Sequence, residues 1–235
     1  MHTRIQLLSV WCIPAFIVIY LFGFIGLSGF VPPPSPTLSA TDIAAIFEQN
    51  RTGIRAGQLI CMVFAGLLYI PFTVLISVHM AHVEGRYPLL AGMQLVGNSI
   101  LCVFFILCSL MWSAVAFRPE LDPQTVRLVN DATWLFFVMM YPTYVVALVA
   151  MALCGFIDKR AQPIYPRWFC FFTLWVAFAG IGGGFATFFK TGPFAWDGLF
   201  GFWTPVAMYL VWLLVLFPLL LKLVKRAALE AVSAN

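Results

Sequence analysis

The sequence predicts an all-α membrane protein, a bundle of six transmembrane helices with a short amphipathic helix in the first outer loop. Of its 235 residues, 63% are hydrophobic and only 9% are charged, whereas soluble domains carry about 25% charged residues. Six long apolar segments recur along the chain, each near the roughly 20 residues that a helix needs to cross the hydrocarbon core. The segments between them are short, so residues 1–235 are expected to form a single membrane domain.

The six predicted spans are bounded by charged residues, prolines or glycines, which commonly end helices. The spans cover residues 7–31, 57–80, 89–117, 132–157, 168–189 and 199–224. The first apolar region is about 24 residues long and exceeds the 7 to 15 of a secretory signal, so it is expected to remain as a helix. The third span is long enough to tilt or to bend near Gly97.

Basic residues predict the orientation, because Lys and Arg accumulate on the cytoplasmic side of membrane proteins. With the N-terminus inside, eight basic residues lie in inner segments and five in outer ones. The inner set is Arg4, Arg86, Lys159, Arg160, Arg167, Lys222, Lys225 and Arg226, and the outer set is Arg51, Arg55, Arg118, Arg127 and Lys190. We therefore expect both termini in the cytoplasm of a bacterial cell, with the protein in the inner (plasma) membrane. The scattered basic residues do not indicate nucleic-acid binding.

The first outer loop contains the amphipathic helix. After a proline-rich start, which favours an extended chain, Ser39 and Asp42 have the spacing of a capping box. Ile43, Ile46 and Phe47 then share one face. This pattern predicts a helix that lies on the outer membrane surface or caps the bundle.

Two arginines follow this helix and are candidate binding residues. Arg51 and Arg55 are one helical turn apart. Either they reach lipid head groups and Glu48, or they form a cationic gate for an anionic head group or a carboxylate.

The fifth span ends in the glycine-rich stretch AGIGGGFATFF. Gly180 and Gly184 favour close packing between helices. The alternative is local unwinding, which membranes tolerate where backbone lines a cavity. Aromatic residues just beyond, including Trp203, fit either an interfacial belt or the mouth of an apolar pocket.

The stretch SVHMAHVEGRYP contains the weak candidates for a metal site, His79, His82 and Glu84. A catalytic zinc usually takes three protein ligands and a structural one takes four, and the only other histidine is His2. No metal site and no cofactor is predicted, and a single metal ion or haem near His79 and His82 is the alternative. The histidines are expected to mark a helix end.

No enzyme motif in the sequence supports a catalytic function. The chain has neither a G-x-S-x-G nor an H-E-x-x-H sequence. Its nine acidic residues lie in predicted loops or at helix ends, so no pair of carboxylates is available inside the membrane. The protein is therefore more consistent with a binding or structural function than with an enzyme.

Neutral polar residues are the deepest polar groups in the spans. Gln94 and Asn98 share one face of the third span, and because a buried amide is costly without a partner they are expected to face the bundle interior. The second, fourth and sixth spans each place an aromatic residue, a proline and a threonine close together, which predicts three kinks. The neighbours expected for the amides are Tyr69, Tyr141, Thr143, Trp203 and Thr204.

Two functions fit these features. The first is binding or transport of a small apolar or amphiphilic molecule inside the bundle. Gln94 and Asn98 either form the polar floor of a ligand cavity or only make structural hydrogen bonds between helices. For this function the candidate ligand-binding residues are Gln94, Asn98, Tyr69, Tyr141, Thr143, Trp203, Thr204, Arg51 and Arg55. The second is a non-catalytic accessory subunit of a larger membrane complex. The expected partners are bilayer lipid, a lipid-like or apolar ligand, and a second copy or another membrane protein.

Overall fold

The computed structural model describes residues 3–233, and within that range the chain is entirely helical apart from its loops. Six segments are long and apolar enough to cross a membrane. They are Thr3–Leu27, Arg51–Glu84, Leu89–Phe117, Pro123–Ile157, Arg167–Phe188 and Leu199–Leu229. The predicted helical bundle with six apolar spans is therefore present in the described residues.

Most spans contain more than one helical element. In chain order the elements are α1 (Thr3–Leu21), the π-helix η1 (Phe22–Leu27), α2 (Ala40–Gln49), α3 (Arg51–Phe64), the π-helix η2 (Ala65–Tyr69), α4 (Ile70–Glu84), α5 (Leu89–Phe117), α6 (Pro123–Met139), α7 (Tyr141–Ile157), α8 (Arg167–Gly180), the 3₁₀-helix η3 (Ile181–Phe188), the π-helix η4 (Leu199–Trp203) and α9 (Thr204–Ser233).

The breaks inside three spans occur at the predicted prolines. Pro71, Pro142 and Pro205 are each the second residue of an α-helix, namely α4, α7 and α9. A proline has no backbone N–H and its ring crowds the preceding turn, so the regular hydrogen-bond pattern cannot continue through it. The chain accommodates this with a π-helical turn before Pro71 and Pro205 and with a break at Met140 before Pro142.

Four spans begin earlier than predicted, the second and the fourth by the widest margins. The second begins at Arg51 rather than at residue 57, and the fourth at Pro123 rather than at residue 132. Before the fourth span, the Asp122 carboxylate accepts hydrogen bonds from the backbone amides of Gln124 and Thr125. This N-cap starts the helix in a polar stretch that hydropathy alone does not detect.

The third span is continuous through Gly97. It consists of α5 alone, an α-helix of 29 residues. A Cβ at Gly97 would come 3.1 Å from the Cβ of Ala147 and would also overlap the carbonyl of Thr143. The glycine therefore permits close approach of α5 and α7, the role of a small residue in a membrane helix interface.

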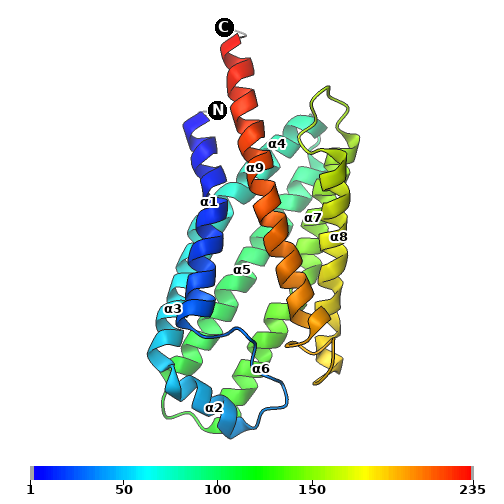
Figure 1. The fold of residues 1–235 in the computed structure, drawn as a ribbon. Helices are drawn as coiled ribbons and strands as arrows, with labels where there is room; N and C mark the ends of the chain where they lie inside the picture. Colours follow the sequence, from blue (N-terminus) through cyan, green and yellow to red (C-terminus); the bar gives the residue numbers. More distant parts are fainter. Residues whose placement is uncertain (1–2, 234–235) are drawn as a thin grey trace.

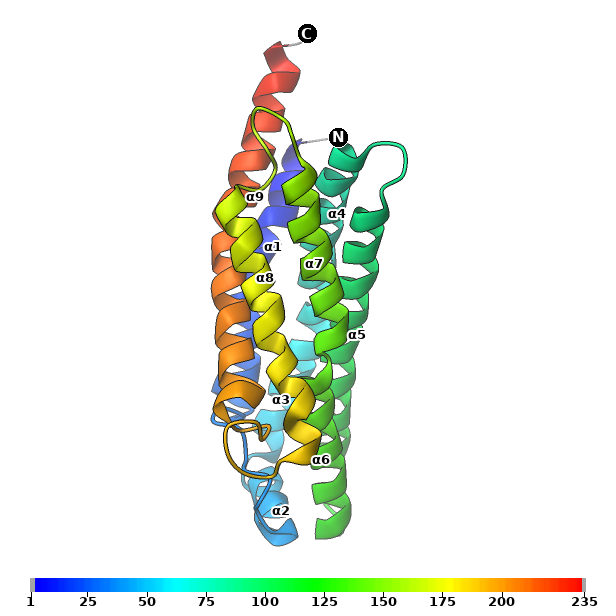
Figure 2. The ribbon, with the colours of Figure 1, turned by 90° about the vertical axis from the view of Figure 1, so that its right-hand side faces the viewer.

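The six spans form a ring in the order of the sequence. Each packs against the next, and α9 returns to pack against α1; Figures 1 and 2 show the elongated bundle that results. Near the termini α4 also contacts α7, and both helices pack on α5. Both ends of the chain lie at the same end of the bundle, where α9 extends beyond the other helices (Figure 2).

The short helix α2 lies at the opposite end of the bundle (Figure 1), where it packs against α6. Ser39 and Asp42 form a reciprocal capping box at its start. Ile43 and Phe47 are buried, and Ile46 is half-buried. The apolar face of α2 therefore packs onto the bundle.

The glycine-rich stretch is wound as the 3₁₀-helix η3 and makes close contacts. A Cβ at Gly183 would overlap the carbonyl of Val138 in α6, and one at Gly182 would overlap the carbonyl of Phe200 in η4. Close packing is thus the role that these glycines have in the fold, and a small residue is needed at each position.

Candidate functional site

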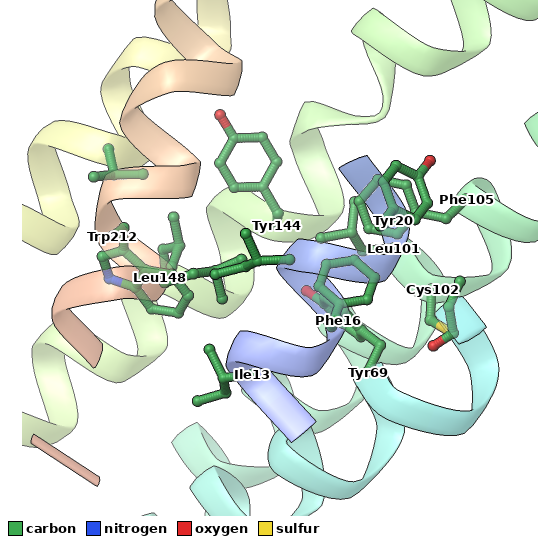
Figure 3. Close-up of a cluster of buried hydrophobic side chains, with 14 of the residues drawn as sticks. Ile13, Phe16, Tyr20, Tyr69, Leu101, Cys102, Phe105, Tyr144, Leu148 and Trp212 are labelled. Carbon is green, nitrogen blue, oxygen red and sulfur yellow. The ribbon is translucent and has the colours of Figure 1, made fainter. Parts of the chain in front are cut away.

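A cavity of about 270 Å³ lies inside the ring, in the half that faces α2. This volume is near the lower end of the range for small-molecule sites, roughly 300 Å³. The lining comes from five spans and is almost wholly apolar. Representative lining residues are Phe16, Phe24, Leu101, Phe105, Phe137 and Leu213; Figure 3 shows part of this apolar cluster around Phe16, Tyr20, Leu101 and Phe105.

The cavity opens sideways, between the first and sixth spans. Helices α1 and α9 are close near the termini and diverge toward the α2 end (Figure 1). Two lining residues on the two sides of this gap, Ile25 in η1 and Trp203 in η4, are each 42% exposed. The opening therefore faces the region that lipid chains occupy around an apolar bundle.

Aromatic rings and loop contacts close the cavity at its α2 end. The rings of Phe24 and Phe137 are stacked with centroids 5.4 Å apart, and Phe202 packs against Phe137 at 6.3 Å. The indole N–H of Trp196 donates a hydrogen bond to the carbonyl of Pro34 at 2.8 Å. This bond joins the loop at residues 189–198 to the loop at residues 28–39 beside the cavity.

Three tyrosines, Tyr20, Tyr144 and Tyr209, are among the residues that line the cavity. Tyr209 forms a hydrogen bond with the Tyr69 hydroxyl, and Tyr69 in turn donates to Oδ1 of Asn98 at 2.8 Å. The hydroxyl groups of Tyr20 and Tyr144 are buried and have no hydrogen-bond partner within the described chain. A buried polar group without a partner is uncommon and calls for an explanation.

Tyr144 is one of the two unpartnered tyrosines that line the cavity. Its side chain is 8% exposed and lines the cavity. Its hydroxyl lies against the backbone of Gly180, another lining residue, so closely that a Cβ there would overlap it. Figure 3 shows the ring projecting from α7, with the hydroxyl directed away from Phe16 and Leu101. The Tyr20 ring lines the same cavity but packs on Phe105 at 5.4 Å.

The two predicted amides are buried but do not line the cavity. Gln94 is 0% and Asn98 is 3% exposed. The Gln94 side chain donates to the carbonyl of Thr73 at 3.4 Å, while Asn98 accepts from Tyr69. Of the candidate neighbours, Tyr69 alone is hydrogen-bonded to either amide in residues 3–233. Asn98 reaches the cavity only indirectly, through Tyr69 and Tyr209.

The other predicted neighbours are dispersed. Trp203 lies at the cavity opening, and Thr204 begins α9 behind it. Thr143 donates its hydroxyl to the carbonyl of Met140 at 3.0 Å, which satisfies it locally. Tyr141 packs over Gly184, where a Cβ would come 2.9 Å from its hydroxyl. The structure therefore does not assemble these residues into one site.

Arg51 and Arg55 lie at the α2 end, between α3 and α5 and outside the central cavity. The Arg51 guanidinium donates to the carbonyl of Ala116 at 3.2 Å. Arg55 lies over the ring of Phe117 at 5.7 Å. Both arginines belong to the helix of the second span rather than to the loop before it.

The two histidines line a separate cavity of about 340 Å³ near the termini, together with Arg160 and Arg226. Their ring centroids are 6.5 Å apart, and residues 3–233 contain no group of three potential metal ligands. Glu84 points elsewhere: its two carboxylate oxygens accept from the amides of Leu90 and Ala91, each at 2.7 Å. Glu84 therefore caps α5 across the turn.

The sequence alone did not single out Tyr20, Tyr144 or Tyr209, whereas it marked Gly180 as a packing glycine or as part of an unwound stretch beside a cavity. The three tyrosines lie in apolar stretches where an interior tyrosine is common. A tyrosine in the middle of a predicted span is a weak signal for a buried hydrogen-bonding group, and only the arrangement of the helices shows which tyrosines meet.

Comparisons with known proteins do not indicate a function for this chain. No known protein family, no curated protein and no solved structure matches this chain. The geometry of the central cavity is therefore the basis for a functional assignment.

Proposed function

We propose that this protein binds a small, largely apolar molecule that carries a hydrogen-bond acceptor, and that the molecule enters the central cavity from the bilayer between α1 and α9. The observation that carries the proposal is an apolar cavity of about 270 Å³ whose exposed lining residues, Ile25 and Trp203, border a lateral opening. A lipophilic ligand concentrates in the bilayer, so a lateral entrance is the direct route to such a site.

The hydrogen-bond acceptor on the ligand is inferred from the unpartnered hydroxyl of Tyr144. An apolar ligand would fill the cavity through contacts with aromatic and aliphatic walls, which supply most of the affinity of such sites. The Tyr144 O–H has no partner in the described chain and lies against Gly180; turned toward the cavity, it would donate to a carbonyl or ether oxygen of the ligand. A ligand with that oxygen gains a hydrogen bond that a pure hydrocarbon cannot form.

Binding fits the cavity better than continuous transport. The central cavity and the cavity near the termini share no lining residue, and the Trp196 hydrogen bond to Pro34 joins the two loops at the other end. With both termini in the cytoplasm of a bacterial cell, as the basic residues predict, the cavity would lie in the outer half of the inner membrane.

The proposal is tested by ligand binding to the purified protein in detergent. Fluorene and 9-fluorenone serve as probes of nearly equal size, the second of which carries a carbonyl group. Val206 lines the cavity, and a Val206→Trp substitution should fill its opening and weaken binding of both probes at least fivefold. Val211 is on the same helix, is 48% exposed and is not part of the lining, so Val211→Trp is the matched control.

Saturable binding that Val206→Trp removes and Val211→Trp leaves intact would support the proposed function. Absence of saturable binding to the wild-type protein would contradict it, as would equal effects of the two substitutions. Co-purification with one fixed membrane protein, without probe binding, would favour the accessory-subunit alternative.

A further inference from the structure

A second site lies on the outside of the bundle, in a groove between α3 and α5 at the α2 end. The groove has a volume of about 740 Å³ and is separate from the central cavity. Its lining residues are Thr52, Arg55, Ala56, Leu59, Met62, Leu110, Ser113, Ala114, Phe117 and Arg118. These residues divide into a polar, positively charged end and an apolar floor.

The charged end contains two arginines that share one aromatic ring. The guanidinium carbon of Arg55 is 5.7 Å from the centroid of the Phe117 ring, and that of Arg118 is 5.5 Å from it. None of the lining residues is acidic. Arg118 is also 3.2 Å from the Glu120 carboxylate, but both side chains are 61% exposed, and an ion pair in that setting is weak.

The apolar floor extends from the arginines along the two helices. Leu59 on α3 is 55% exposed and Leu110 on α5 is 51% exposed, and Met62 lies between α3 and α5 further along the groove. From Arg55 to Met62 the groove follows about two turns of α3, or roughly 10 Å. It thus leads from the end of the span into the region of the acyl chains.

We propose that this groove binds an anionic phospholipid, with the phosphate between Arg55 and Arg118 and one acyl chain along Leu59, Met62 and Leu110. Arginine suits this role because its planar guanidinium donates two parallel hydrogen bonds to phosphate oxygens. The hydroxyls of Thr52 and Ser113, which line the groove, lie within the same polar end. The charge of the arginines favours an anionic head group over a zwitterionic one. This site is independent of the ligand proposed for the central cavity.

The test compares lipid retention by native mass spectrometry of the detergent-solubilised protein. Phosphatidylglycerol and phosphatidylcholine with identical acyl chains are added in turn, and glycerol phosphate is added as the head group without chains. The head-group variant is Arg55→Gln with Arg118→Gln. Its control is Arg127→Gln. This substitution also removes a positive charge, but from α6, a helix that does not line the groove.

A second pair of variants tests the apolar floor without altering charge. Leu110→Trp blocks the groove, whereas Val103→Trp changes a residue of α5 that is equally exposed, at 51%, but does not line it. Both substitutions face outward, so the protein is expected to keep its fold, which the melting temperature without added lipid verifies.

The expected result is preferential retention of phosphatidylglycerol by the wild type, at least fivefold over phosphatidylcholine. The arginine double variant and Leu110→Trp should each lose this preference, while Arg127→Gln and Val103→Trp keep it. Equal retention of the two lipids, or a preference that survives the arginine double variant, would overturn the proposal. Glycerol phosphate binding as strongly as the lipid would also overturn it, because the groove would then be a site for a soluble phosphate. If the double variant does not fold, the comparison of lipid retention by Leu110→Trp and Val103→Trp decides between these outcomes.

Discussion

At the scale of single residues, the unpartnered hydroxyl of Tyr144 is the clearest functional signal. Tyr144 is buried beside Gly180, and both residues line the cavity. Burying a hydroxyl without a hydrogen bond costs the folded protein about 1–3 kcal/mol. Under the proposed function, the hydroxyl is retained because it donates to an acceptor on the bound ligand.

Tyr144→Phe is therefore expected to leave the fold intact and to weaken binding of 9-fluorenone about five- to tenfold, the value of one hydrogen bond of about 1 kcal/mol or slightly more. Binding of fluorene should not change, because the hydrocarbon accepts no hydrogen bond. Isothermal titration calorimetry in detergent measures both affinities.

Tyr165→Phe is the matched control for this prediction. Tyr165 is 1% exposed and its hydroxyl also has no partner within the described chain, yet it does not line the cavity. Its substitution should affect neither probe. Equal losses in Tyr144→Phe and Tyr165→Phe would show that the effect is general, and unchanged binding in both would show that Tyr144 does not contact the ligand. In either case the lateral cavity would still be tested separately by Val206→Trp.

A second residue-scale feature is the hydrogen-bonded chain from Asn98 through Tyr69 to Tyr209. It joins α5, η2 and α9 at the wall of the cavity. Asn98→Leu removes the acceptor for Tyr69 and should destabilise the protein by about 1 kcal/mol, because the Tyr69 hydroxyl loses one hydrogen bond and keeps the one with Tyr209. Since Asn98 does not line the cavity, probe binding should fall much less than stability.

Chemical unfolding in mixed detergent micelles measures the change in stability for Asn98→Leu, with probe affinity measured on the same samples. Tyr69→Phe should give a larger loss, since it breaks this bond and also the one between Tyr69 and Tyr209. A variant that is as stable as the wild type but no longer binds the probe would instead place Asn98 in the ligand site.

At the scale of structural elements, Asp158 organises the connection between α7 and α8. Its side chain is 0% exposed. The carboxylate accepts two hydrogen bonds from the Arg160 side chain, at 2.8 and 2.7 Å, and one from the backbone amide of Ile164 at 2.8 Å. Burial alone would raise the pKa of Asp158, but the Arg160 side chain and the backbone amides outweigh it and lower the pKa below its usual value.

This shift predicts that the loop is stabilised by ionised Asp158. A carboxyl whose pKa is lower in the folded state contributes stability above its unfolded-state pKa of about 3.9, and that contribution is lost as the pH falls through the folded value. Asp158→Asn should cost about 2 kcal/mol at pH 7, typical of hydrogen bonds to a charged group. The difference between variant and wild type should shrink below about pH 4.

Unfolding measured between pH 3 and pH 7 tests this prediction. Glu120→Gln is the control, because its carboxylate is in an exposed surface pair. A difference between Asp158→Asn and wild type that stays constant down to pH 3 would show that the charge of Asp158 does not contribute.

At the scale of the whole molecule, closure of the ring determines where a ligand can bind. Consecutive spans pack side by side, and α9 meets α1 only near the termini before the two diverge (Figure 1). A ring that was packed along its full length would have no lateral entrance. The divergence of the first and last spans is thus the global feature on which the proposed function depends.

The common position of both termini leads to a topology prediction. The loops at residues 28–39 and 158–166 lie at opposite ends of the bundle. Thr37 and Ala161 are exposed residues in these loops. A membrane-impermeant thiol reagent added to intact cells should label Thr37→Cys and not Ala161→Cys, because the basic residues place the termini and the second loop in the cytoplasm.

Unsubstituted protein is the control for that experiment. Five of its six cysteines are buried and Cys12 is partly buried, so little labelling is expected. Labelling of Ala161→Cys alone would mean that the orientation is inverted, and the central cavity would then lie in the inner half of the membrane.

The sequence was sufficient for those features that depend on neighbouring residues. Apolar length identified all six spans, and α5 was predicted with its observed bounds. The prolines at 71, 142 and 205 predicted three helix junctions because a missing N–H acts within one turn. Burial of Gln94 and Asn98 followed from the cost of an amide in hydrocarbon. The starts of the second and fourth spans were missed because polar first turns such as 123–131 do not contribute to hydropathy.

The site depended on features that no local pattern encodes. Tyr69 and Asn98 are 29 positions apart, and Tyr69 and Tyr209 are 140 apart; they meet only because the ring brings η2, α5 and α9 together. Trp203 and Arg55 were both candidates, yet helix rotation and tilt place one at the opening of the cavity and the other in an outer groove. Composition determines that this chain enters a membrane, because transfer free energy is additive over residues. The position and lining of the cavity are determined by how the helices pack, because they depend on the shapes of surfaces that are distant in the sequence.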